Sequence, residues 1–198
     1  MERNTQRSLC PLCGKNAMDT IIALLRGINV GGHHKLPMKA LKVLLEELGL
    51  ANVQTYIQSG NVVFQSEETD RARLAQRITA AIANNFGFAP QVFLLDLKSL
   101  QDAMAANPFP EGEAEPKSLH LFFLDGIPTN PNLDALEAVR AENERFALIG
   151  QVFYLHAPDG IGRSKLAERV GRGWDVSITA RNWRTVSTLL AMGTAVSP

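Results

Sequence analysis

The chain has 198 residues, 45% of them hydrophobic, so it is long enough to bury a core as one domain or as two small ones. Its 20 basic and 20 acidic residues cancel to a formal net charge of zero, which argues against a dedicated nucleic-acid-binding or membrane-surface protein. No run approaches the roughly 18 apolar residues that a membrane span needs, and the N-terminus lacks the apolar core of a signal peptide, so we expect no membrane association and a cytoplasmic location.

Residues 1–17 are expected to form a disordered extension. This segment contains both cysteines, Cys10 and Cys13, in a CxxC pair that supplies only two of the four ligands of a closed zinc site. His33 and His34 would nominally complete the set, but adjacent side chains diverge. A redox CxxC normally follows a strand and opens a helix, whereas the flanks here are short and polar. We therefore predict no metal and no other cofactor.

Residues 18–97 read as a strand–helix–strand–strand–helix–strand unit. Short apolar runs bounded by glycines are typical of buried strands, and apolar residues at helical spacing indicate two amphipathic helices. A Gly60-Asn61 pair predicts a tight type II′ hairpin between the middle strands. The strands are expected at residues 21–25, 53–57, 62–64 and 90–95, and the helices at residues 37–48 and 71–86.

Residues 98–117 are expected to link two halves of the chain. A short helix at residues 97–106 is followed by Asn107-Pro108-Phe109-Pro110 and an acidic loop that contains Glu111, Glu113 and Glu115. Proline and acidic residues in succession favour an irregular connection. The boundary between the halves is therefore placed in this segment.

Residues 118–198 repeat the pattern imperfectly and add a C-terminal helix. We expect strands at residues 119–124, 146–149, 152–155 and 176–179, and helices at residues 132–141, 165–170 and 182–192. The predicted fold class is α+β, with two ferredoxin-like (βαββαβ) units packed together. Because the helices of such a unit cover only one face of its sheet, the bare faces can pack together, and their junction is a natural cleft.

Four short segments contain candidate ligand-binding residues. In the loop at residues 26–32 the glycines are explained by tight turns, and the loop matches neither a Walker A sequence nor GxGxxG. Arg26 and Asn29 favour a site because a turn requires neither. The hairpin also accounts for Ser59-Gly60-Asn61, while Ser164 suits the N-cap of a helix whose first turn contains Lys165, a cation that opposes the helix dipole.

Basic residues gather in the C-terminal region. Residues 163–184 contain six bases against two acids, which is either solvated surface or a region that meets an anion. Arg181, Asn182 and Thr185 at the expected start of the last helix would offer charge and hydrogen bonds to a phosphate or carboxylate. The full set of proposed ligand contacts is Arg26, Asn29, Lys35, Ser59, Asn61, Lys165, Arg181, Asn182 and Thr185.

Five motifs in the same order resemble the domain of unknown function 1697 family, whose members are mostly bacterial. These motifs read ALLRGINVGGHHKLPM, TYIQSGNVVF, NPF, GIGRSKL and TARNWRTV, and the resemblance extends from about Met18 to Met192. It implies two ferredoxin-like units and no established biochemical activity. His34 stands where relatives often have asparagine, and the cysteine-containing extension has no counterpart in the family pattern.

The favoured hypothesis is a small anionic ligand, bearing phosphate or carboxylate, bound between the two units with or without turnover. No arrangement of a known hydrolase, metalloprotease or EF-hand is present in the sequence, so no catalytic residue is assigned. The alternatives are single-stranded nucleic-acid binding, for which Tyr56, Phe64, Phe122 and Phe123 would have to stack on bases, and a protein-interaction module. A monomer or a weak homodimer is expected.

Overall fold

The computed structural model describes residues 18–197, so the predicted extension with its two cysteines lies outside the described residues. Within this range the chain is a mixed α/β protein with two four-stranded antiparallel sheets and six α-helices. The first sheet comprises β1 (Asp19–Leu25), β2 (Ala51–Tyr56), β3 (Asn61–Ser66) and β4 (Val92–Asp96), in the order β2-β3-β1-β4. The second comprises β5 (Leu119–Leu124), β6 (Arg145–Ile149), β7 (Val152–His156) and β8 (Ile178–Asn182), in the order β6-β7-β5-β8.

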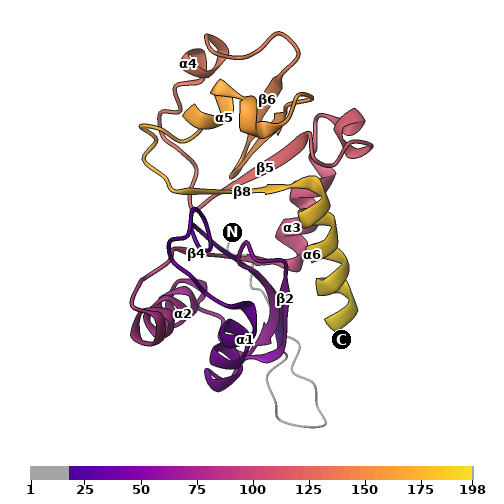
Figure 1. Cartoon of the computed structure of the whole chain (residues 1–198). Helices are drawn as coiled ribbons and strands as arrows, with labels where there is room; N and C mark the ends of the chain where they lie inside the picture. The colour runs from indigo at the N-terminus through magenta and orange to yellow at the C-terminus, as the bar shows by residue number, and fades with distance from the viewer. Residues whose placement is uncertain (1–17, 198) are drawn as a thin grey trace, which may run out of the picture.

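The two sheets follow the same order of strands because each half repeats one local pattern. Figure 1 shows the first half with α1 (Met38–Glu47) and α2 (Arg71–Phe86) on one side of its sheet, and the second half with α4 (Leu133–Glu137) and α5 (Lys165–Arg169) on the far side of the other. The other faces of the two sheets contribute to one shared core.

Alternation along β1 explains why this strand is apolar throughout. Ile21, Ala23 and Leu25 pack against α1 and α2, whereas Ile22 and Leu24 point into the core between the halves. Side chains in a strand alternate between faces, so a strand covered on both faces reads as a continuous apolar run. In the second sheet, likewise, Phe122 faces the outer core and Phe123 the shared one.

Two helices from different parts of the sequence complete the shared core. The linker helix α3 (Leu97–Ala105) packs beside the C-terminal helix α6 (Trp183–Val196), and Figure 1 shows both on the same side of the molecule. Gly193 makes their approach close, because a Cβ added there would be 2.7 Å from Cδ1 of Leu97. Trp183, Val186 and Leu189 contribute to this core, as their helical spacing predicts.

Most predicted elements agree with the structure to within a few residues, but three local predictions were wrong. The first hairpin has a four-residue loop, Ile57–Gly60, and Asn61 begins β3 opposite Tyr56, so it does not have a two-residue Gly-Asn turn. Helix α4 is shorter than the expected residues 132–141. The last strand extends to Asn182, which places Arg181 in a strand and leaves Asn182 as the cap of α6.

Candidate functional site

The guanidinium of Arg181 is the centre of a buried polar network between the halves. Arg181 is 9% exposed, and it donates five hydrogen bonds of 2.5–3.0 Å. A guanidinium has five N–H donors, so none is left for a ligand in this arrangement. The acceptors are Oδ1 of Asn61, Oγ1 of Thr179 and the carbonyls of Ala180, Leu25 and Ser59.

Three other predicted contact residues belong to the same network or adjoin it. Asn61 is fully buried, and its amide donates to the Tyr56 carbonyl and to Oγ of Ser59. Asn29 lies in the left-handed region (φ 54°) and bonds the main chain of Leu36 twice and the carbonyl of Gln58 once. Asn61 and Arg181 therefore meet in a packed junction whose polar groups satisfy one another.

The other predicted residues do not join this network. Arg26 is exposed and reaches Oε1 of Gln91 at 3.5 Å. Lys35 and Lys165 are also exposed, and Lys165 begins α5 after the Ser164 cap, which accepts from the Ala167 N–H as predicted. Asn182 accepts from the N–H of Thr185, a buried residue, and thereby caps α6. The nine predicted residues are thus divided among a buried network, a helix cap and separate exposed positions.

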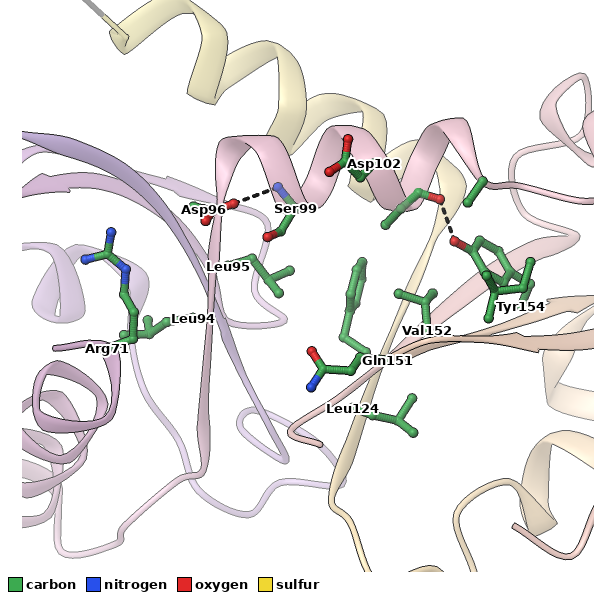
Figure 2. A pocket seen from close by; sticks show the side chains of 14 residues that line it. Arg71, Leu94, Leu95, Asp96, Ser99, Asp102, Leu124, Gln151, Val152 and Tyr154 are labelled. Atoms are coloured by element: carbon green, nitrogen blue, oxygen red, sulfur yellow. Dashed lines mark hydrogen bonds between the residues drawn. The ribbon is translucent and has the colours of Figure 1, made fainter. Parts of the chain in front are cut away.

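A cleft of about 390 Å³ does lie between the halves, although none of the predicted residues lines it. One wall comes from β4 and α3, and the other from β5 and the β6–β7 hairpin. Figure 2 shows Leu95 and Gln151 pointing into this space from opposite walls. The apolar part of the lining includes Leu94, Leu95, Ala103, Ala106, Phe123 and Val152.

The charged residues of the cleft lining are two aspartates, Asp96 and Asp102, and one arginine, Arg71. Asp96 caps α3 by accepting from the Ser99 N–H at 2.6 Å through Oδ1, which leaves Oδ2 without a partner among the described residues. Asp102 bonds Lys98 through both oxygens at 2.8 and 2.6 Å. The cation of the lining, Arg71, is already paired with Asp19 at 2.7 Å. Asp96 is therefore the carboxylate of the lining without a cationic side-chain partner among the described residues.

Tyr154 fixes the two walls of the cleft to each other. Its hydroxyl donates to the carbonyl of Ala103 in α3 at 2.6 Å, the contact drawn in Figure 2, and burial raises the pKa of this phenol to about 12. A neutral phenol that bridges β7 and α3 makes the inner end of the cleft rigid. It does not supply a base at neutral pH.

Two histidines, the buried His120 and the half-buried His156, have a buried Nδ1 without a hydrogen-bond partner within the described residues. Burial lowers the pKa of His120 to about 4. Burial and the charge of Arg145 lower the pKa of His156, whose Nδ1 is 3.7 Å from Oε1 of Glu111. Glu111 itself pairs with Arg145.

The geometry bears on two other classes of function. Among residues 18–197 no three or more histidine, cysteine, aspartate or glutamate side chains are placed to hold a metal ion. None of the helices in this range is long and apolar enough to cross a bilayer. Phe64, Phe122 and Phe123 are at most 5% exposed, so they cannot stack on nucleic-acid bases without unfolding of the sheets.

The cleft residues could not be identified from the sequence, because they share a place in the folded structure and no common sequence motif. Asp96 carried one usable local signal, since an aspartate directly before apolar residues at helical spacing is a recognisable N-cap. Nothing local indicated that this cap would face Gln151, which follows it by more than 50 residues.

Comparison with known proteins places the chain among proteins without an assigned activity. A family profile described as "Protein of unknown function (DUF1697)" matches residues 18–154. A similar solved structure is that of the conserved bacterial protein SP0830 from Streptococcus pneumoniae, with 23% sequence identity and a TM-score of 0.63. The match covers 89% of this chain and 99% of that one, and at this identity it shows a shared fold alone. No curated protein matches the chain.

Proposed function

Since the chain belongs to the DUF1697 family of proteins of unknown function, we propose from its geometry that it binds a small amphipathic molecule in the cleft between its halves. The observation that carries the proposal is a cleft of about 390 Å³ lined by both apolar and polar side chains, among them the carboxylate of Asp96, which has no cationic side-chain partner among the described residues. Small-molecule sites are typically concave, mostly apolar and supplied with a few polar groups that orient the ligand.

The charge of the lining selects the ligand's polar group. Oδ2 of Asp96 and Oγ of Ser99 lie at the start of α3, with the amide of Gln151 on the opposite wall. A carboxylate accepts hydrogen bonds and attracts cations, so it favours an ammonium or another donor over an anion. The expected anionic ligand does not suit this cleft, because the charge of Arg71 is already engaged by Asp19.

Matched six-carbon probes test the proposal. Hexylamine, hexanol and hexanoate share an apolar body, so calorimetric titration with each isolates the effect of the head group. We expect hexylamine to bind more tightly than hexanol, and hexanoate to bind most weakly. Tightest binding of hexanoate would disprove the assignment of a donor ligand.

Two substitutions localise binding to the cleft. Asp96→Asn removes the charge but keeps a good helix cap, and it should weaken hexylamine binding about tenfold while hexanol binding stays constant. Ala106→Phe should block the cleft, whereas Ala105→Phe, at an exposed neighbour that does not line it, should not. Equal effects of the two phenylalanine substitutions would place the probe elsewhere. Mass spectrometry of molecules retained on the purified protein would then identify the natural ligand.

We also propose that each half is a ferredoxin-like unit. The support is the strand order, β2-β3-β1-β4 repeated as β6-β7-β5-β8, together with a helix after the first and third strand of each half. Division into units at residues 18–97 and 118–198, with a linker at 98–117, follows from that proposal. A cytoplasmic location and a monomeric or weakly dimeric state remain predictions, which localisation of a tagged chain and light scattering would test.

A further inference from the structure

A second cavity, of about 330 Å³, lies on the outer side of the second half. Its walls are the start of α4 and the segment that follows α5, and it shares no lining residue with the cleft. The functional groups at this cavity are Arg169, Arg172, Trp174 and Asn132. Two of the six basic residues at positions 163–184, Arg169 and Arg172, line this cavity.

Both guanidinium groups of the cavity are uncompensated. Arg169 and Arg172 are exposed, and neither side chain takes part in a hydrogen bond or ion pair among the described residues. The nearby Asp175 is not their counter-ion, because its oxygens accept from the N–H and the hydroxyl of Thr129 at 2.7–3.3 Å. Two guanidinium groups that line one cavity without an acidic partner among the described residues repel each other, and an anion bound between them would lower that cost.

Local backbone geometry holds these groups on one side of the chain. The N–H of Arg172 bonds the Arg169 carbonyl and that of Trp174 bonds the Gly171 carbonyl, which makes two successive tight turns. Gly171 has φ 77°, and a Cβ there would lie 2.5 Å from Cδ1 of Ile178, so this turn requires glycine. The two arginines and the tryptophan are therefore presented together by a constrained segment.

Trp174 and Asn132 add a flat wall and a further donor. The indole of Trp174 packs edge-on against Phe153 at 5.9 Å between ring centroids, which fixes its orientation. Asn132 uses Oδ1 to accept from the Ala135 N–H. Its amide N–H groups have no partner within the described part of the chain, so they are available to a ligand. The cavity thus combines two cationic forks, an amide donor and an aromatic surface.

We infer that this cavity is a binding site for a small organic phosphate, with the phosphoryl group between Arg169 and Arg172 and a planar body against Trp174. Guanidinium groups bind phosphate oxygens through paired hydrogen bonds, and aromatic rings stack on planar ligands. The site goes beyond the proposed cleft function, and it stands or fails independently of it.

Phenyl phosphate, inorganic phosphate and phenol are the probes that test this site. On the ¹⁵N-labelled wild-type protein, phenyl phosphate should shift the indole N–H signal of Trp174, while that of the buried Trp183 serves as the internal reference. Phenol should leave both signals in place, and inorganic phosphate should bind more weakly than phenyl phosphate. An unmoved Trp174 signal at saturating phenyl phosphate would overturn the inference without any substitution.

Charge-matched variants separate the site from general attraction to a basic surface. Arg169→Gln and Arg172→Gln should each weaken phenyl phosphate binding about tenfold. Arg163→Gln removes the same charge from an exposed position outside the cavity, and it should change affinity less than threefold. Equal losses from all three substitutions, or none from the first two, would contradict the proposed site. The exposed positions make folding of each variant secure, and melting temperatures check it.

Discussion

Replacing Arg181 by methionine tests whether the buried network is structural. Arg181→Met keeps an unbranched side chain but removes five charge-assisted hydrogen bonds, three of them to Leu25, Ser59 and Asn61 in the other half. Even at the low end of about 1.5 kcal/mol each, these bonds contribute about 7 kcal/mol. Burial lowers the pKa of the guanidinium from 12.5 to about 10, so the charge costs about 3 kcal/mol, which the substitution recovers.

The expected net loss is therefore about 4 kcal/mol in the free energy of unfolding, or roughly 8–16 °C in melting temperature for a chain of this size. Urea unfolding followed by tryptophan fluorescence measures it, with Arg184→Met, at an exposed position three residues later, as the control that should stay within about 0.5 kcal/mol. A loss below about 1 kcal/mol in Arg181→Met would refute the reasoning. It would mean that the hydrogen bonds of the guanidinium contribute little to the stability of the fold.

Three further substitutions test separate features of the fold. Because burial lowers the folded-state pKa of His120 from 6.5 to about 4, the unfolded chain binds the extra proton first as pH falls. The contribution of the neutral ring to stability is therefore complete above about pH 6.5 and is lost toward pH 4. Between pH 8 and pH 5 the free energy of unfolding of the wild type should fall by about 2 kcal/mol more than that of His120→Gln. The control variant His33→Gln, changed at an exposed position, should follow the wild type. Gly60→Ala should cost about 2–4 kcal/mol, since φ is 75° and the new Cβ would lie 2.8 Å from a neighbouring side chain. Gly87→Ala, with φ 77° and open space around it, should cost only about 1–2 kcal/mol, and equal losses in denaturant melts would show that crowding at residue 60 is unimportant. Tyr154→Phe should lower the free energy of unfolding by about 1 kcal/mol in the same melts. Hexylamine affinity should stay within twofold of the wild type, because the Tyr154 hydroxyl already donates its hydrogen to α3. A larger loss of affinity would show that this hydroxyl contacts the probe.

Local sequence was sufficient to predict most of the helices and strands. Helical spacing located α1 and α2, and the glycine that follows residue 86 marks the end of α2 because it adopts φ 77°. The strands expected at residues 146–149 and 152–155 agree with the second hairpin, whose two-residue loop begins at Gly150 with φ 57°. At Gly60-Asn61 the same reasoning was wrong, because Gly60 packs against Leu25 and so ends a longer loop.

The candidate sites required the tertiary structure for a different reason. Arg181 and Asn61 were both singled out from the sequence, but whether a guanidinium binds a ligand or the protein depends on acceptors 120 and more residues away. The cleft likewise joins the start of α3 to the β6–β7 hairpin through the packing of two sheets. By itself the sequence determined most of the strands of two antiparallel sheets and the polar side chains at their loops. Only the tertiary structure decided which of those side chains are satisfied internally, as at Arg181, and which have no partner among the described residues, as at Arg172, because a polar group's partners are set by long-range packing.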